Sequence, residues 1–206
     1  MAKLVRIGLT GGIAAGKSTV AQRWQQAEAV VIEADELAHR VLEPGTPTWK
    51  SVVKEFGRDI LNADQTINRP KLGETVFRDE SKRLALNKIV HPAVLRMLTE
   101  LLAECEREGR AKFAVATIPL LYEVGIERDF DCVVTVACSE QTQLARLMAN
   151  GFSEEQARAR ISAQWPMQKK MDRADFVIWN DGTRRMLSEQ ADIIWAIIKE
   201  NCHAKR

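Results

Sequence analysis

Residues 11–18 carry the clearest chemical signal in the chain. They read Gly-Gly-Ile-Ala-Ala-Gly-Lys-Ser and match the pattern G-x-x-x-x-G-K-[ST] in full. In such a loop the backbone N–H groups surround the β-phosphate of a nucleotide, and the helix that follows directs its positive end at the anion. Lys17 is expected to bridge the β- and γ-phosphates, and the Ser18 hydroxyl to bind Mg²⁺. The pattern therefore predicts a site for ATP and Mg²⁺ built from Gly11, Gly12, Ile13, Ala14, Ala15, Gly16, Lys17, Ser18 and Thr19.

Asp35 is the second candidate for chemistry. It lies just beyond the apolar run Val30-Val31-Ile32, which would place it at the edge of the sheet where the phosphate loop is also expected. A carboxylate there could accept the proton of an acceptor hydroxyl and help to order Mg²⁺. The alternative is that Asp35 caps the helix expected over 36–41. We expect the catalytic role, with Lys17 as its partner in transfer, because the phosphate loop lies alongside.

Short apolar runs rich in Val and Ile supply the elements that must position these residues. They cover Leu4 to Leu9, Val30 to Ile32, Phe113 to Ile118, Cys132 to Ala137 and Phe176 to Trp179. A helix is expected to begin near Lys17, and another to cover Arg184 to Lys199. Strands that alternate with helices through short connections predict a parallel sheet. The fold class is therefore α/β: a P-loop kinase with a five-stranded parallel sheet flanked by helices.

Strand-like runs disappear between residues 36 and 109, where helical periodicity covers Lys50 to Phe56, Lys71 to Phe77 and Ser81 to Glu108. Pro92 is expected to end or kink the last of these helices near His91. We predict a helical acceptor-binding insertion at 36–109 within a nucleotide-binding core of 1–35 and 110–206. A polar helical stretch rich in Arg and Lys, about 141–173 and here called the lid segment, is predicted to form a lid in that core.

A phosphate loop by itself does not separate kinases from other nucleotide-binding proteins. A GTPase should carry Asn-Lys-x-Asp, but Asn87-Lys88 lacks the Asp, and a large ATPase should have an acid where the third strand ends in Thr117-Ile118-Pro119. A small-molecule kinase fits what remains. A nucleoside or sugar kinase is the alternative within that class, and a nucleotide-gated binding protein with no transfer activity is the alternative outside it.

Composition and charge limit the classes of partner that the chain is expected to bind. The formal net charge is +2 and there is no basic stripe, which argues against a general nucleic-acid surface. The longest apolar runs have strand length, so no membrane partner is expected. The four cysteines form no CxxC pair. They are therefore expected to be reduced thiols, as in a protein of the cytoplasm. We expect a cytoplasmic monomer or weak homo-oligomer.

Further motifs along nearly the whole chain resemble the dephospho-coenzyme A kinase family. The matching residues, in chain order, are Leu9 to Ile13 and Gly16 to Thr19, Ile32 to Asp35, Pro44, Gly45 and Pro47, Phe56 and Gly57, Leu84 with Leu86 and Asn87, His91 and Pro92, Pro119 to Glu123, Ser153 to Glu155, Arg160 and Gln164, Ala174 and Asp175, and Asn180 to Gly182. The resemblance implies ATP-dependent phosphorylation of the ribose 3′-hydroxyl of dephospho-CoA.

The resemblance also implies roles for individual positions. Asp35 matches the general base of the family, the insertion corresponds to the CoA-binding domain, and Asn180 and Gly182 belong to a loop near adenine. The chain departs from the family pattern at Glu33, where the family has Asp, and in the lid segment, where an Arg before Gly151 is missing. Arg146, Arg158 or Arg160 could supply the phosphate contact instead. The resemblance favours Arg160, which lies in a matched stretch, and Arg146 is retained as a candidate.

Overall fold

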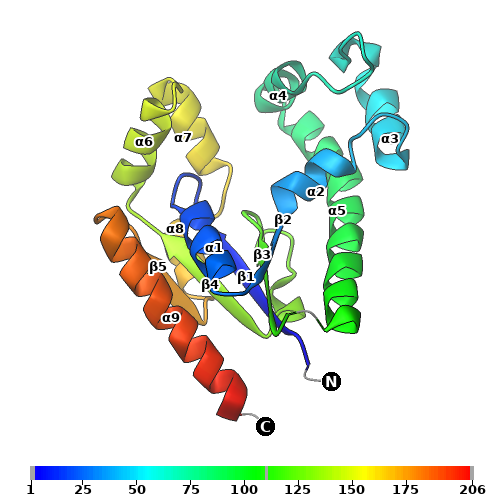
Figure 1. The fold of residues 1–206 in the computed structure, drawn as a ribbon. Helices are drawn as coiled ribbons and strands as arrows, with labels where there is room; N and C mark the ends of the chain where they lie inside the picture. The colour runs from blue at the N-terminus through cyan, green and yellow to red at the C-terminus, as the bar shows by residue number, and fades with distance from the viewer. Residues whose placement is uncertain (1–2, 110, 205–206) are drawn as a thin grey trace. The chain divides into compact units, whose positions relative to one another are not determined.

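The computed structural model describes residues 3–109 and 111–204, and for residues 77, 78 and 202–204 it describes the helical backbone alone. Five strands form one sheet in the order β2-β3-β1-β4-β5 (Figure 1). Their bounds are β1 Val5–Gly11, β2 Val30–Glu33, β3 Phe113–Thr117, β4 Cys132–Ala137 and β5 Phe176–Trp179. The central strand β1 pairs in parallel with β3 and β4, and β4 pairs in parallel with β5. The predicted five-stranded parallel sheet is confirmed.

The chain divides into two compact units, one of residues 1–32 with 104–206 and the other of residues 33–103. The first unit contains the sheet and the helices α1 Lys17–Gln26, η2 Glu127–Asp129, α6 Glu140–Ala149, α7 Glu154–Ser162, α8 Met167–Met171 and α9 Arg184–Ala204. The lid segment therefore consists of α6, α7 and α8 with their connections.

The second unit is helical. It contains α2 Ala34–Arg40, α3 Pro47–Phe56, η1 Arg58–Ile60, α4 Arg69–Arg78 and most of α5 Glu80–Glu108. The Thr46 and Asn68 side chains accept hydrogen bonds from the first turns of α3 and α4, and each cap is followed by a proline near the helix start. Pro92 was expected to end or kink its helix; it does not end the helix, because α5 continues through it. A proline removes one N–H from the helical ladder, and the many bonds on either side of it in a long helix carry the element past that gap.

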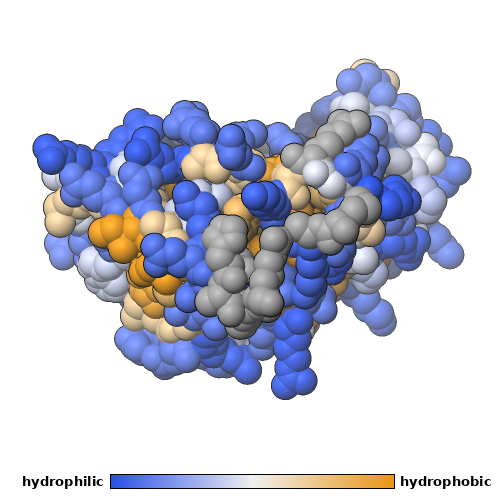
Figure 2. All heavy atoms as spheres, turned by 60° about the horizontal axis from the view of Figure 1, so that its bottom comes forward, coloured by the Kyte–Doolittle hydropathy of each residue, from blue (hydrophilic) through white to orange (hydrophobic). Residues whose placement is uncertain are grey.

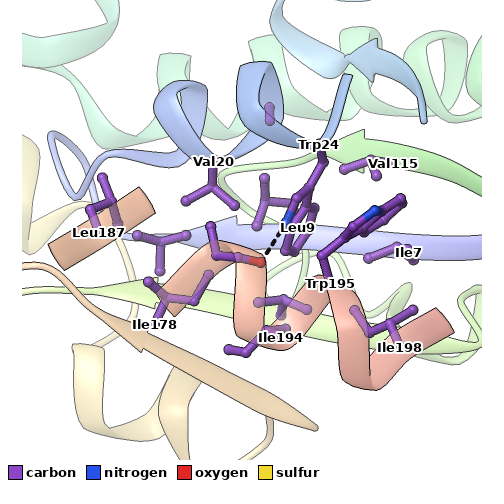
Figure 3. Packing of buried hydrophobic residues seen from close by; sticks show 14 of the residues in the cluster. Ile7, Leu9, Val20, Trp24, Val115, Ile178, Leu187, Ile194, Trp195 and Ile198 are labelled. Atoms are coloured by element: carbon purple, nitrogen blue, oxygen red, sulfur yellow. Dashed lines mark hydrogen bonds between the residues drawn. The ribbon is translucent and has the colours of Figure 1, made fainter. Parts of the chain in front are cut away.

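The main core lies on the side of the sheet that α1 and α9 cover (Figure 3). Alternate residues of β1 and β4, such as Ile7, Leu9 and Val134, point into it. The rings of Trp24 on α1 and Trp195 on α9 stack with centroids 5.4 Å apart. The Trp24 indole N–H donates to the carbonyl of Ala191 at 2.9 Å, so burial of this polar group is compensated. The cluster fixes the start of α1 relative to β1, and so it supports the loop between them.

The opposite side of the sheet is also closely packed. A Cβ at Gly8 in β1 would lie 2.6 Å from Leu121 Cδ1 and 3.2 Å from the ring of Phe130. The segment after β3 and the short helix α8 cover this side, where Tyr122 and Lys170 are buried. The sheet is therefore enclosed within its own unit, as parallel sheets usually are.

The surface is dominated by hydrophilic side chains on the face drawn in Figure 2, with hydrophobic residues in limited patches. The large apolar side chains that are exposed include Met186, Ile193 and Ile197 on α9 and Val177 and Trp179 on β5. In the part of the chain that the structure describes, no helix combines the length and the apolar character needed to cross a bilayer.

Candidate active site

The turn between β1 and α1 has the backbone geometry that its glycines permit. Gly11 has φ 146° and Gly16 has φ 103°, values that L side chains rarely adopt. A Cβ at Gly11 would lie 2.0 Å from the carbonyl oxygen of Val136 on the neighbouring strand, so glycine is required there on steric grounds. Gly16 occupies the N-cap position of α1, has no side chain to cap the helix, and is followed by a first turn without an acidic residue. The positive end of α1 is therefore left for an anion.

The Lys17 ammonium lies over this turn. Its Nζ donates to the carbonyl oxygens of Gly11 at 3.1 Å and of Gly12 at 2.9 Å. Ser18, the next residue, is exposed in the first turn of α1. Both side chains thus lie at the loop, and their contacts with phosphates and Mg²⁺ stay predictions.

Three consecutive carbonyl groups of the loop are held by side chains from elsewhere in the same unit. Gln143 Nε2 donates to Ile13 O at 2.8 Å, Arg146 Nη1 to Ala14 O at 3.0 Å, and Asn180 Nδ2 to Ala15 O at 2.8 Å. Because a peptide group is planar and trans, each bound carbonyl directs the N–H of the following residue the opposite way. The side chains outside the loop therefore set the direction of the amides that would face a phosphate.

A pocket of about 260 Å³ adjoins the loop. Its lining residues are Ala14, Gly16, Thr19, Arg146, Asn180, Gly182, Arg184 and Leu187. Six of these were predicted from the sequence as ATP-binding residues, and the structure brings them together around one cavity. Arg184 and Leu187, at the start of α9, were not predicted, because they look like ordinary positions of an amphipathic helix.

The loop after β5 is tied to the start of α6. Asp181 Oδ1 accepts hydrogen bonds from the backbone N–H of Ser139 at 2.9 Å and from its hydroxyl at 3.1 Å. Desolvation acts to raise the pKa of Asp181, but hydrogen bonds from Ser139 and Thr142 and the charge of Arg146 outweigh it and hold this pKa below its usual value. The Arg146 guanidinium also donates to Asn180 O at 2.9 Å, so a single arginine joins the loop after β5 to the phosphate loop.

The other arginines of the lid segment have different surroundings. Arg158 is exposed and pairs with Glu154 at 2.8 Å and with Glu140 at 3.5 Å, which is the arrangement of a solvated helix face. Arg160 lies with its guanidinium carbon 4.2 Å from the centre of the Phe152 ring and does not line the pocket described above. The structure thus places Arg146 against the loop and Arg160 on α7.

Asp35 belongs to the second unit, and the structure describes only its local setting there. Helix α2 begins at Ala34 with Glu33 at the N-cap position, so Asp35 is an exposed residue of the first turn rather than its cap. The capping alternative is wrong because the helix starts two residues earlier than the sequence suggested. A carboxylate in a first turn is still favoured by the helix dipole.

Several residues of the site escaped sequence reasoning. Gln143 is buried and binds the loop, yet it lies in a polar helix where nothing distinguishes it from its neighbours. Gln164 accepts a hydrogen bond from the Ile13 N–H at 2.8 Å. Its match to a family pattern was the only sequence signal, and it indicated no role. The fully buried Lys170, which pairs with Glu123 at 2.8 Å, looked like one of the many cations of the lid segment.

The residues of the site can accommodate a metal ion in one way. Among the described residues, no group of three or more His, Cys, Asp or Glu side chains is arranged to hold one. Mg²⁺ bound through substrate phosphates and one or two protein oxygens does not need such a group. The exposed Ser18 hydroxyl in the first turn of α1 suits that mode of binding.

Comparison with known proteins gives consistent matches over the chain. A family model described as dephospho-CoA kinase matches residues 5–185. A Bacillus cereus protein named dephospho-CoA kinase is 47% identical over 198 residues, which cover 94% of this chain and 98% of that protein.

Solved structures also match this chain over nearly its whole length. A Thermus thermophilus protein is 33% identical with a TM-score of 0.78, over 96% of this chain and 98% of that one. A dephospho-CoA kinase from Campylobacter jejuni is 26% identical with a TM-score of 0.62, over 94% of this chain and 96% of that one.

Proposed function

The chain belongs to the dephospho-CoA kinase family, and we propose that it transfers the γ-phosphate of ATP to the ribose 3′-hydroxyl of dephospho-CoA through the phosphate loop and Asp35. It is a phosphotransferase of the last step of coenzyme A synthesis, and its acceptor is a small molecule. The observation that carries the proposal in this chain is the phosphate loop itself: its carbonyls are bound from outside, and its helix end carries no acidic residue.

Lys17 and Ser18 have complementary roles in the proposal. Lys17 now donates to two carbonyls of its own loop, and on nucleotide binding it would exchange them for β- and γ-phosphate oxygens. Ser18 would contribute its hydroxyl to Mg²⁺. When bound, Mg²⁺ would supply positive charge that offsets the charge of the phosphates. The amides of the loop would bind the β-phosphate and so position the γ-phosphate for transfer.

Asp35 is proposed as the group that accepts the proton of the ribose hydroxyl and helps to order Mg²⁺. Support comes from its family match and from its exposed position in the first turn of α2, where its carboxylate is available to a partner. Transfer of a phosphoryl group depends mainly on positioning and charge, so the role of Asp35 is to orient the acceptor oxygen and remove its proton. Direct transfer requires no phospho-enzyme.

The remaining parts of the chain have supporting roles in the proposal. The pocket beside Asn180 and Gly182 would receive the adenine of ATP, and the lid segment would close to exclude water, with Arg146 and Arg160 near the phosphates. The helical unit of residues 33–103 would bind the CoA portion of the acceptor.

We propose a cytoplasmic enzyme, monomeric or weakly associated. No disulfide bond joins the cysteines of the described region, which is compatible with that location.

The test is ADP release from Mg²⁺-ATP with and without dephospho-CoA, beside a panel of nucleosides and sugars. ADP formation that depends on dephospho-CoA and yields CoA is expected. Strong preference for another acceptor would refute the acceptor assignment, and no acceptor-dependent turnover would favour a nucleotide-binding protein without transfer.

Two substitutions test the residue roles. Lys17→Ala should nearly abolish transfer, and Asp35→Asn should lower turnover far more than it weakens ATP binding. Glu36→Gln, the next residue and also exposed, is the control for the loss of one charge from α2. Near-normal turnover of Asp35→Asn would show that Asp35 is not the base.

A further inference from the structure

The peptide groups on both sides of Ile13 are held by two glutamines of the lid segment. The Ile13 N–H donates to Gln164 Oε1 at 2.8 Å, and the Ile13 carbonyl accepts from Gln143 Nε2 at 2.8 Å. Gln143 lies on α6, whereas Gln164 lies in the connection between α7 and α8. Two separate parts of the lid segment therefore meet at one residue of the phosphate loop.

The packing at Gly12 shows how closely these parts approach the loop. A Cβ at this position would lie 2.3 Å from Gln143 Nε2 and 2.4 Å from Met167 Cε. Gly12 itself is buried and its φ does not demand glycine. The absence of a side chain at Gly12 thus makes room for residues of the lid segment.

The backbone next to Gln164 is held in place by a buried ion pair. The next residue, Trp165, donates its N–H to Glu123 Oε1 at 2.8 Å. The same carboxylate oxygen receives Lys170 Nζ at 2.8 Å, and Lys170 is fully buried. Lys170 Nζ also donates to Pro119 O at 2.8 Å, so the connection between α7 and α8 is fastened to the segment after β3.

Planarity of the peptide group connects these bonds to phosphate binding. Ile13 O and Ala14 N–H belong to one rigid plane, and Gly12 O and Ile13 N–H belong to the preceding one. Gln143 therefore sets the direction of the Ala14 amide. Gln164 sets the plane whose other end, Gly12 O, accepts from Lys17 Nζ. Movement of Gln143 would turn an amide of the phosphate loop, and movement of Gln164 would turn the carbonyl that positions the Lys17 ammonium.

We propose that Gln143 and Gln164 are positioning residues for phosphoryl transfer, which couple the placement of the lid segment to the grip of the phosphate loop on ATP. The inference rests on the proposed binding of ATP phosphates by this loop, and it is independent of the identity of the acceptor. Neither glutamine needs to contact the reacting atoms, because each acts through the peptide groups of Ile13.

The first test measures amide exchange of Ile13 and ATP binding in the enzyme without acceptor. A neutral hydrogen bond of this kind corresponds to about 2- to 10-fold in an equilibrium constant. Gln164→Ala should speed exchange of the Ile13 amide and weaken ATP binding by about that factor, and Gln143→Ala should weaken ATP binding similarly. The matched controls are Gln168→Ala on α8 and Gln141→Ala on α6, because both of these glutamines are exposed. The controls should leave both quantities unchanged.

The second test uses kinetics and a variant that keeps the acceptor. With dephospho-CoA, the alanine variants should raise KM for ATP about 2- to 10-fold with a smaller change in kcat. Gln164→Glu retains an oxygen for the Ile13 N–H, so it should restore slow amide exchange while its charge still raises KM for ATP. If Gln164→Ala is poorly folded, Gln164→Glu and Gln143→Ala still test whether the two glutamines position the phosphate loop.

Two results would overturn the inference. Exchange of the Ile13 amide in Gln164→Ala equal to that in Gln168→Ala would show that the bond does not hold the loop. Unchanged ATP binding in both alanine variants would show that it does not matter for the nucleotide. Amide exchange and ATP binding are measured without acceptor, so an error in the acceptor assignment would not change them. That error would appear in the acceptor panel instead.

Discussion

Replacing Lys170 with methionine should destabilise the nucleotide-binding unit strongly. The Lys170 side chain is 0% exposed and that of its partner Glu123 is 14% exposed, with Nζ and Oε1 2.8 Å apart. The ammonium also donates to Pro119 O at 2.8 Å, and the carboxylate accepts from the Trp165 N–H at 2.8 Å. Methionine has nearly the length of lysine, so Lys170→Met removes the charge and its hydrogen bonds and leaves a small change of volume.

The loss of unfolding free energy depends on which charge stays buried without its partner. Removing one partner of a buried ion pair leaves a charge without compensation and typically costs 3–5 kcal/mol, so about 3 kcal/mol is expected here. The lower end applies because the Glu123 carboxylate is slightly exposed and keeps the Trp165 N–H. Glu123→Gln leaves the ammonium buried with an amide oxygen in place of the carboxylate, and should also cost about 3 kcal/mol. The double variant Lys170→Met with Glu123→Gln should cost less than the sum by about 1–3 kcal/mol.

The assay is urea unfolding of the wild type, the two single variants and the double variant, read as a double-mutant cycle. The control cycle uses Arg158→Met and Glu154→Gln, an exposed pair one turn apart, whose coupling should be only about 0.3–0.5 kcal/mol. Loss of less than about 1 kcal/mol in Lys170→Met would refute the reasoning, because the buried charge would then be compensated in another way. Additive effects in the double variant would equally show that the two side chains do not act as a pair.

Three further predictions concern the loops of the site. Gly11→Ala should cost more than about 3 kcal/mol in urea unfolding, because its Cβ would lie 2.0 Å from the Val136 carbonyl oxygen at φ 146°. Gly73→Ala in α4, with no neighbouring atom within 4 Å, should instead stabilise the protein by up to about 1 kcal/mol, and an equal effect of both would refute the steric argument. Asn180→Ala should weaken ATP binding about 10-fold in calorimetry, since a loop carbonyl loses its donor, and unchanged affinity would contradict this. The lowered pKa of Asp181 means that its stabilising contribution is full above the unfolded value of 3.8 and is lost as the pH falls through the folded value. Asp181→Asn should therefore flatten the loss of stability below about pH 4, and a parallel acid-unfolding profile would refute it.

The elements of the fold could be predicted because their signals are local. Each strand is a short apolar run, and the turn is marked in the sequence by Gly11 and Gly16, whose φ values L side chains rarely adopt. Helix ends were less predictable. Helix α5 passes through Pro92, since the bonds of a long helix tolerate the loss of one donor, whereas sequence rules treat each proline as a boundary.

The residues that hold the loop from outside could be predicted only in part, for a physical reason. The motif specifies residues that act on the phosphates themselves, the glycines through their backbone and Lys17 through its ammonium, so these residues are visible in the sequence. The partners of its carbonyls lie in distant segments, and a glutamine that binds a carbonyl has the same letter as one that faces water. Gln143 and the exposed Gln141 are two residues apart on the same helix, and only the fold distinguishes them.

The cations of the lid segment include residues that bind protein groups instead of facing a phosphate. Its many cations indicated contacts with phosphate, yet Lys170 is turned inward to a carboxylate, and Arg146 donates to carbonyls of the loop and of Asn180. A donor that binds a loop carbonyl acts on the nucleotide through the rigid peptide plane, whereas a cation in direct contact acts through its charge. The two modes differ in their response to salt. Substitution of Gln143 or Gln164 should change ATP affinity by a factor nearly independent of ionic strength, whereas the effect of Lys17→Ala should shrink as salt is added, because screening weakens the charge that it removes.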